Sequence, residues 1–246
     1  MYYRSGAATM FSGPYWPAVY GDQLTAVHDH GAKREARGTV SYELRPTLAV
    51  VEETGARFVV VPGRGLNHCF AIAETVCVIA PHNSVEFLRF YNSRSADFSS
   101  DGETFEGHYG ERLCMGRQLE YVIEELKRDP GSRRAVATIW NPLVDTCVGK
   151  RDYPCNVMVT FKIMNGKLDA HVIRRSSDLL WGVPYDHVVF TVLQDVVSAS
   201  LGIQSGAMIE TTDSLHVYRG LYDDTLERAL LATSAGKGVP GLTAVI

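Results

Sequence analysis

The sequence predicts an α+β protein in which helices pack on a large, mainly antiparallel sheet. Three patterns carry this prediction: a long hairpin over residues 157–175, an amphipathic helix over residues 117–127 and a mostly apolar helix over residues 185–201. Strands and helices with an apolar face are stable only when that face is covered. We therefore expect these elements to pack together around a core.

The segments before the hairpin favour two strands, one helix and two connections. Residues 39–44 (TVSYEL) alternate in polarity and residues 58–61 (FVVV) are aromatic and β-branched, so both are expected strands. Residues 67–79 (NHCFAIAETVCVI) are largely apolar after the first turn and predict a helix. The polar or Pro/Gly-bearing stretches 93–104 and 141–154 are expected surface connections.

Both later helices end at residues that stop helices. The helix over 117–127 places its apolar residues on one face and stops before Pro130. The helix over 185–201 stops at Gly202, a residue type that favours a helix C-terminus. Because it is mostly apolar, we expect this helix to be central and buried.

The hairpin brings a thiol close to a positive charge. Apolar and polar residues alternate on both arms, and Asn165-Gly166 between them is a preferred two-residue turn because both positions tolerate positive φ. Counting outward from the turn makes Cys155 a neighbour of Arg175 and Ser176. A thiolate needs nearby positive charge to form, so this geometry marks Cys155 as a candidate nucleophile, although a lone cysteine is more often an inert core residue.

Composition predicts a single domain that spans residues 1–246. The chain has 46% apolar and 21% charged residues and a net charge of −4, which argues against a general nucleic-acid binder. The sequence shows no signal pattern and no apolar run long enough for a bilayer, so we expect a cytoplasmic protein with no membrane association. Five cysteines, an odd number without a CxxC pair, predict neither a disulfide framework nor a metal site.

A few polar residues lie within apolar segments. Glu74 interrupts a helix pattern, where a carboxylate is either on a solvated edge or a general acid or base with a raised pKa. Five others near apolar segments are each more often structural than catalytic, and spacing alone does not assemble them into a site: Asp178, Asp186, His187, His216 and Tyr218.

Four motifs in order resemble the thymidylate synthase superfamily. They are DPGSRRAVATIWNP, PCN, NGKLDAHVIRRSSDLLWGVPYDHVVF and SLHVY, and the match runs from about Arg34 to Tyr218. Residues 1–29 and those from 221 onward match poorly. The resemblance implies the thymidylate synthase-like fold, a homodimer, and 5,10-methylenetetrahydrofolate as co-substrate without a metal.

The resemblance also implies roles for individual residues. Cys155 matches the nucleophile that attacks C6 of a pyrimidine, Glu74 the glutamate that organises water and moves protons, and Tyr109 the tyrosine near the nucleophile. The implied phosphate site consists of Arg34, Arg175 and Ser176, with Arg133 and Arg134 reaching across the dimer. Arg37 competes with Arg34 for the loop position. Base, sugar and folate contacts fall on Asp178, Gly182, Tyr185, Asp186, His216 and Tyr218.

Asp186 is the most informative departure from the family pattern. Members that act on uracil nucleotides carry Asn here, whose amide matches N3–H and O4. A carboxylate instead accepts from the N4 amino group of cytosine and, if protonated, can also answer N3. The chain therefore resembles the cytidylate hydroxymethylase branch, known from phage DNA modification and nucleoside-antibiotic biosynthesis.

Two further departures concern the product and the nucleophile's neighbour. The loop after the Glu74 helix lacks tryptophan, since the three tryptophans are Trp16, Trp140 and Trp181. Water could then reach the exocyclic carbon and give a hydroxymethyl product. Asn156 replaces the usual His after the nucleophile, which we interpret as tolerated variation.

We therefore expect a cytidylate 5-hydroxymethyltransferase that acts on CMP or dCMP. A cytidylate C5-methylase and a thymidylate synthase that methylates dUMP are alternatives with the same folate. A non-catalytic nucleotide or mRNA binder is a third, from another class. The sequence leaves the choice between ribose and deoxyribose open, with residue types that lean toward dCMP.

Overall fold

The computed structural model describes residues 2–5, 8–36, 38–59, 65–220 and 223–236. The structure divides into two compact units, each built from separate segments of the chain. Unit 1 comprises Met1–Leu66, Arg174–His187 and Gly206–Ile246, and unit 2 comprises Asn67–Ile173 and Val188–Ser205. That the whole chain is one domain stays a prediction.

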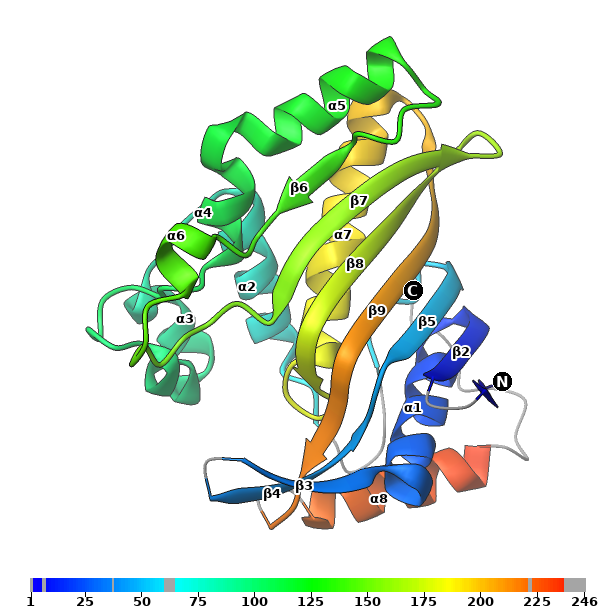
Figure 1. Ribbon diagram of the computed structural model, residues 1–246, viewed down its shortest axis with the longest axis vertical. Helices are drawn as coiled ribbons and strands as arrows, with labels where there is room; N and C mark the ends of the chain where they lie inside the picture. Colours follow the sequence, from blue (N-terminus) through cyan, green and yellow to red (C-terminus); the bar gives the residue numbers. More distant parts are fainter. Residues whose placement is uncertain (1, 6–7, 37, 60–64, 221–222, 237–246) are drawn as a thin grey trace. The chain divides into compact units, whose positions relative to one another are not determined.

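Within the described residues, nine strands form one mixed sheet (Figure 1). The strands are β1 (Tyr2–Ser5), β2 (Ala8–Tyr15), β3 (Ala32–Ala36), β4 (Thr39–Leu44), β5 (Thr47–Glu53), β6 (Val136–Thr138), β7 (Asn156–Met164), β8 (Lys167–Asp178) and β9 (Gln204–Tyr218). Their order is β1-β2-β5-β9-β8-β7-β6, with β4 paired to β3 and β9. β2 and β5 are parallel, whereas β1–β2, β3–β4, β4–β9, β5–β9 and β6–β7 are antiparallel. The expected α+β class with a large sheet is confirmed.

In unit 1, one buried helix supports the strands. α1 (Trp16–His30) packs against β2, β4 and β5 and against α8 (Asp223–Gly236). Trp16, Tyr20 and Leu24 recur on one face of α1 and are fully buried. The Tyr20 hydroxyl donates a 2.7 Å hydrogen bond to the carbonyl of Leu179. This bond ties α1 to the segment that follows β8.

Unit 2 contains most of the helices (Figure 1). They are α2 (His68–Ile79), α3 (Val85–Tyr91), α4 (Tyr109–Cys114), α5 (Gln118–Arg128), α6 (Pro142–Asp145) and most of α7 (Val183–Leu201), whose start up to His187 belongs to unit 1. Gln194 on α7 donates a buried 2.7 Å hydrogen bond to the carbonyl of Leu168 on β8. This contact holds the expected central helix against the sheet.

Most of the expected elements are confirmed. The strand over 39–44 keeps its bounds as β4, and the helices over 117–127 and 185–201 appear as α5 and α7. The helix over 67–79 is α2, with the Asn67 side chain as N-cap accepting from the Phe70 amide at 3.0 Å. The two-residue turn also holds, since Asn165 and Gly166 have φ of 52° and 76°.

The prediction of a strand over residues 58–61 is wrong for the two residues of this segment that the structure describes. Phe58 and Val59 have no regular structure, and Val60 and Val61 lie outside the described residues. Val59 is fully buried, so the apolar pattern reports burial of an irregular segment rather than strand pairing.

The two expected connections contain short helical turns. A 3₁₀ helix covers Ser93–Phe98, and α6 lies within 141–154. Asn92 and Asn141 cap these turns by accepting hydrogen bonds from the amides of Arg94 and Leu143. The loop prediction missed them because a single turn leaves too few residues for a periodic pattern.

Candidate active site

A cluster of buried charges surrounds Asp186 in unit 1. The Arg174 guanidinium is 2% exposed and lies with Nε 3.7 Å from Asp186 Oδ2 and Nη2 3.1 Å from Glu210 Oε1. Asp186 lies in the first turn of α7, where the helix dipole also favours a negative charge. The predicted base-reading carboxylate therefore lies beside a cation that the sequence analysis did not single out.

His187 and Glu210 complete this cluster. His187 Nδ1 lies 3.0 Å from Glu210 Oε1, and the His187 ring stacks on Trp16 with centroids 4.0 Å apart. Burial alone would raise the pKa of Glu210, but Arg174 and His187 lower it to about 2. Burial lowers the pKa of His187, against the opposing effect of Glu210. At neutral pH the cluster therefore holds an ionised Glu210 and a neutral His187 that donates from Nδ1.

The predicted phosphate and sugar residues Arg34, His216 and Tyr218 share one face of unit 1. In the antiparallel register, Ser41 on β4 faces Arg34 on β3 and Tyr218 on β9, and Glu43 faces His216. The His216 and Tyr218 rings meet edge to face with centroids 4.9 Å apart. The strand register thus places these three residues on the same side of the sheet.

Glu43 connects the members of this face. It accepts a hydrogen bond from Arg34 Nε at 2.9 Å and one from the Ser214 hydroxyl at 2.7 Å. Burial alone would raise the pKa of Glu43, but the hydrogen bonds from Ser214 and Arg34 bring it below its ordinary value. His216 Nδ1 lies 3.2 Å from the Ser214 carbonyl, which can only accept, so Nδ1 carries the proton and Nε2 is an acceptor when the ring is neutral.

Three predicted base and folate residues lie between the end of β8 and the first turn of α7: Asp178 ends β8, Gly182 precedes α7 and Tyr185 lies near the start of α7. Asp178 accepts hydrogen bonds from the amides of Leu180 at 2.6 Å and Trp181 at 3.2 Å, which fixes the turn. A Cβ at Gly182 would lie 3.2 Å from the Ser177 hydroxyl, so only glycine fits without a shift. Tyr185 is buried, and its ring lies 6.4 Å from that of Trp181. Arg175 and Ser176 precede this turn on β8 and are half-buried.

In unit 2, Glu74 lies on α2 and is half-buried. Burial and the Glu74 charge raise the pKa of Cys77 to about 11, so this neighbouring thiol stays protonated and unreactive at neutral pH. All five cysteines are free thiols, and Cys155 is half-buried immediately before β7. Cys77 is therefore not a candidate nucleophile, and the role of Cys155 stays a prediction.

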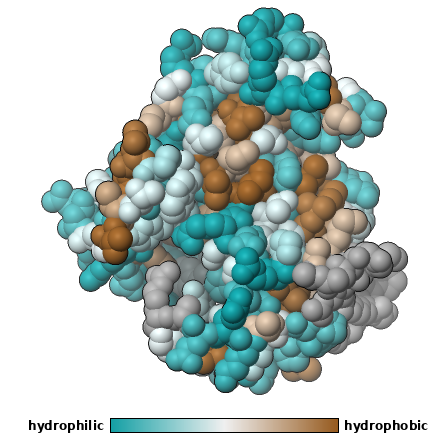
Figure 2. Space-filling view, viewed as in Figure 1, coloured by the Kyte–Doolittle hydropathy of each residue, from teal (hydrophilic) through white to brown (hydrophobic). Residues whose placement is uncertain are grey.

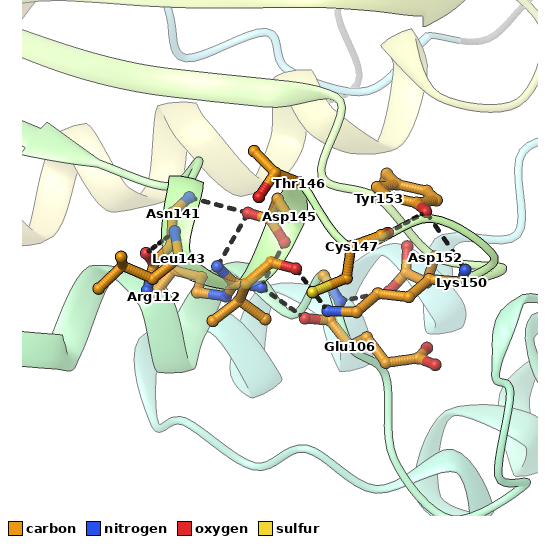
Figure 3. A network of polar contacts seen from close by, with 12 residues as sticks. Glu106, Arg112, Asn141, Leu143, Asp145, Thr146, Cys147, Lys150, Asp152 and Tyr153 are labelled. Atoms are coloured by element: carbon orange, nitrogen blue, oxygen red, sulfur yellow. Dashed lines mark hydrogen bonds and ion pairs between the residues drawn. The ribbon is translucent and has the colours of Figure 1, made fainter.

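A polar network supports the segment that leads to Cys155 (Figure 3). Arg112 on α4 forms a buried bidentate pair with Asp145 at 2.8 and 2.9 Å and also donates to the Glu106 carbonyl at 2.7 Å. Asp145 in turn accepts from the Asn141 amide at 2.8 Å. Tyr109 is the first residue of α4, and Cys155 follows the segment that contains Asp145. The Arg112–Asp145 pair therefore joins the two segments that carry these predicted catalytic residues.

Two further contacts hold the end of this segment. Asp152 Oδ2 accepts from the Gly107 amide at 2.8 Å, although burial raises the pKa of Asp152. The Tyr153 hydroxyl donates to the Cys147 carbonyl at 2.6 Å and accepts from the Lys150 amide at 3.2 Å. The hydrogen bonds of Asp152 and Tyr153 therefore hold the residues just before Pro154 and Cys155 in place (Figure 3).

The start of α4 packs directly on α2. A Cβ at Gly110 would lie 2.6 Å from the carbonyl oxygen of Cys77, so a glycine is required beside Tyr109. His108 caps the helix by accepting from the Glu111 amide at 3.2 Å. Burial lowers the pKa of His108 to about 4, which keeps the ring neutral and able to accept.

The predicted interface arginines are exposed and differ in their contacts. Arg134 Nη2 lies 3.0 Å from Glu125 Oε1, and Glu125 also accepts from Ser132 and pairs with Arg128. Arg133 makes no ion pair with any residue that the structure describes. Both side chains thus present positive charge at the surface of unit 2.

Several predicted site residues are brought together, and others are not tested. Within unit 1 the structure groups Arg34 with His216 and Tyr218. Asp178, Gly182 and Tyr185 lie between the end of β8 and the first turn of α7, which also holds Asp186. The closeness of Cys155 to Arg175 and Ser176 stays a prediction. Arg37 lies outside the described residues.

Sequence reasoning missed Glu43, Arg174 and Glu210 as supporting residues. The period-2 pattern carries a signal for Arg174, which continues the inward series Leu168, Ala170 and Val172. Glu210 likewise follows the buried Met208 at the same spacing. Charges at inward positions of a strand need a partner, and that requirement would have marked both.

Two kinds of site were sought among the residues that the structure describes, a metal-binding cluster and a membrane-spanning helix. No group of three or more His, Cys, Asp or Glu residues in them is placed to hold a metal ion. No helix among them is long and apolar enough to cross a membrane.

Comparison with known proteins gives consistent matches. Residues 18–234 match the family described as thymidylate synthase. The chain is 36% identical over 223 residues to a deoxyuridylate hydroxymethyltransferase of Bacillus phage SP01, covering 85% of this chain and 58% of that protein. Proteins of the same name from Pseudomonas phage M6 and Delftia phage PhiW-14 are 30% and 31% identical, covering 85% and 84% of this chain and 61% of each. The chain spans about three fifths of the length of these relatives.

Proposed function

The chain belongs to the thymidylate synthase family, and we propose that it is a cytidylate 5-hydroxymethyltransferase that takes its carbon from 5,10-methylenetetrahydrofolate. The observation that carries the proposal is the buried carboxylate of Asp186 at the start of α7. A carboxylate accepts from the N4 amino group of cytosine, whereas the O4 of uracil would oppose one acceptor to another. That mismatch costs on the order of 1–3 kcal/mol in a buried site.

The hydroxymethyl product is supported by the relatives and by the loop composition. The three phage proteins are named as hydroxymethyltransferases, and the segment 92–104 contains no tryptophan. A site that admits water at the exocyclic carbon adds a hydroxyl, whereas a dry site permits hydride transfer and a methyl product.

The segment from the end of β8 to the first turn of α7 has the chemistry to hold a folate. Trp181 and Tyr185 offer two tilted aromatic rings, and Asp178 offers carboxylate oxygens to ring N–H groups. When bound, the folate supplies a one-carbon unit at the oxidation level of formaldehyde.

The remaining roles fall to residues of this chain. Cys155 adds to C6 and makes C5 nucleophilic, and it is eliminated at the end. Glu74 orders the water that provides the hydroxyl group, and Tyr109 lies near the nucleophile. Asp186 holds N3 and N4 of the base.

The phosphate is bound by arginines and a hydroxyl. Arg175 and Ser176, with Arg34, suit a phosphate dianion through charge-assisted hydrogen bonds. Arg133 and Arg134 reach the site of a second subunit in a homodimer. On the sheet, Figure 2 shows apolar surface over β7, where a second copy could pack.

Deoxyuridylate hydroxymethylation is the second candidate function. The names of the phage relatives favour it, because those proteins are described as acting on deoxyuridylate. In that case Asp186 would have to carry a proton and donate it to O4.

Tritium release from C5-labelled nucleotides tests the proposal. Purified protein with methylenetetrahydrofolate is given CMP, dCMP, dUMP or UMP labelled at C5, with Cys155→Ser as the control. We expect release from CMP or dCMP and none from the control. Release from dUMP alone would replace the proposal by the second candidate, and release from no nucleotide would indicate a non-catalytic binder.

A further inference from the structure

Glu43 on β4 lies between the strands of two predicted substrate-binding residues and has no role in the chemistry described above. It accepts a 2.9 Å hydrogen bond from Nε of Arg34 on β3 and a 2.7 Å hydrogen bond from the Ser214 hydroxyl on β9. Its side chain is 14% exposed, and β3 and β9 are the two strands that pair with β4. A carboxylate that is largely withdrawn from water and bonded on both oxygens is a candidate for positioning its partners.

The Arg34 guanidinium is anchored by one nitrogen. Nε donates to Oε1 of Glu43, whereas Nη1 and Nη2 donate no hydrogen bond to any residue that the structure describes. The Arg34 side chain is 55% exposed, which leaves room for a ligand beside these two nitrogens. A guanidinium carries its N–H donors in one fixed plane, and those on the η nitrogens suit the oxygens of a phosphate. An anchor at Nε therefore orients the group without occupying the nitrogens that would hold a phosphate.

Ser214 extends the contact of Glu43 to His216. The Ser214 hydroxyl gives its proton to Glu43, so its oxygen can only accept from His216 Nδ1, which lies 3.5 Å away. The Ser214 carbonyl lies closer to the same nitrogen, at 3.2 Å. Both neighbours favour a proton on Nδ1 and leave Nε2 of the neutral ring as an acceptor for a hydroxyl group.

The surroundings of Glu43 keep it ionised. Burial alone would raise its pKa, but the hydrogen bonds from Ser214 and Arg34 and the charge of Arg34 bring it below the ordinary value. At neutral pH Glu43 is therefore a carboxylate that accepts from both partners. Hydrogen bonds to charged groups are roughly twice as strong as those between neutral groups. Arg34 is thus held more firmly than an exposed arginine without a partner.

We infer that Glu43 is a positioning residue for the substrate phosphate, because it anchors Arg34 by Nε and turns the η nitrogens toward the ligand. The inference rests on the proposed function, in which Arg34 binds the phosphate of a nucleoside monophosphate. Through Ser214, the same carboxylate orients His216 for the sugar. The alternative is competition between Glu43 and the phosphate for Arg34, which predicts the opposite effect of removing the carboxylate.

The contribution of the phosphate is measured by binding alone, without turnover. Isothermal titration calorimetry gives the Kd of CMP, dCMP, dUMP and UMP and of the four matching nucleosides. For the nucleotide that binds best, the Kd of the nucleoside divided by the Kd of the nucleotide is the phosphate ratio. In Glu43→Ala we expect this ratio to fall about ten-fold. In Glu43→Gln it should fall less, because the amide oxygen can still accept from Arg34 Nε.

A double-mutant cycle tests whether Glu43 acts through Arg34. Arg34→Ala should lower the phosphate ratio, and adding Glu43→Ala to it should lower the ratio no further. Additive losses would place the effect of Glu43 elsewhere and overturn the inference. An unchanged ratio in Arg34→Ala would overturn it as well, because Arg34 would then not bind the phosphate.

Asp213→Ala is the matched control, because Asp213 pairs with Arg45 at the surface at 3.0 Å and lies on the strand of Ser214. It removes the carboxylate partner of an arginine outside the predicted phosphate site, so its phosphate ratio should match the wild type. An equal fall in Asp213→Ala and Glu43→Ala would show a general effect of surface charge and overturn the inference. A role of Glu43 confined to folding would weaken nucleotide and nucleoside alike, leave the ratio unchanged and overturn it too.

The identity of the nucleotide that binds best separates this inference from the proposed function. If dUMP binds better than the cytidylates and Glu43→Ala still lowers the phosphate ratio, the proposed base is overturned and the role of Glu43 stands. A higher ratio in Glu43→Ala would show competition for Arg34 and overturn the inference. Equal Kd values for each nucleotide and its nucleoside in the wild type would also overturn it, because the chain would then have no phosphate site.

Discussion

At the scale of single residues, Asp186 carries the base assignment. The variant Asp186→Asn would place an amide that can donate to O4 and accept from N3–H of uracil. With cytosine, the NH₂ group of the same amide would face the N4 amino group, which is also a donor. We expect kcat/KM for cytidylates to fall about ten- to a hundred-fold, which corresponds to roughly 1–3 kcal/mol, while turnover of dUMP increases. Steady-state kinetics on both bases measure this. Asp213→Asn is the control, because Asp213 pairs with Arg45 at the surface and is not among the proposed site residues. An unchanged preference for cytosine would contradict the assignment.

Candidate residues could be named from the sequence where a family motif surrounds them, and their roles stay predictions. Cys155 and Asp186 could be selected from the sequence because a motif surrounds each of them. Arg174 and Glu210 could not, because their significance lies in contacts between β8, β9 and α7 that the pattern of a single segment does not contain.

At the scale of elements, His108 links the stability of α4 to pH. Its folded-state pKa of about 4 is below the ordinary 6.5, so the unfolded chain takes up a proton that the folded protein resists. Stability from this group is therefore complete above pH 6.5 and is lost as pH falls toward 4, by roughly 3 kcal/mol. His108→Asn keeps a capping side chain and removes the titration. Urea unfolding from pH 7 to 4.5 should show a shallower pH dependence for the variant, and parallel curves would contradict this role.

The Arg112–Asp145 pair gives a second prediction for α4. Arg112→Met leaves a buried carboxylate without its partner and should destabilise the protein by about 3–5 kcal/mol. The double variant Arg112→Met with Asp145→Leu removes both charges and should recover much of that loss. Urea denaturation of the two variants measures the difference. Equal stability of the single and double variants would show that the pair is not coupled.

Helices and strands were predicted correctly where a regular pattern of apolar residues extends over a whole segment. The prediction failed where a buried segment has no regular backbone structure. β4, α5 and α7 follow their patterns closely. The segment 58–61 misled because a buried chain can be apolar without pairing, and α1 was not anticipated because its polar residues Gln23 and Asp22 interrupt the pattern.

At the scale of the whole molecule, the proposal requires two subunits that exchange arginines. Cys155→Ser and the double variant Arg133→Ala, Arg134→Ala should each be inactive alone. Mixed and reassembled, the two chains form heterodimers with one intact site, so activity should return to about a quarter of the wild-type value. No recovery, with mixed dimers present by mass spectrometry, would place the arginines in the site of their own subunit.

The family could be predicted from the sequence because its motifs lie in the segments that form β7, β8, α7 and β9. The strand order within unit 1 could not be predicted, because it depends on pairings between segments far apart in the chain, such as β5 with β9.

Mass spectrometry of the product tests the central claim most directly. Purified protein is incubated with methylenetetrahydrofolate and, separately, with CMP, dCMP, dUMP and UMP. We expect a cytidylate to gain one CH₂O and the uridylates to remain unchanged, and the reactive cytidylate identifies the sugar. A gain of CH₂O or CH₂ on dUMP alone would contradict the claim that Asp186 selects cytosine.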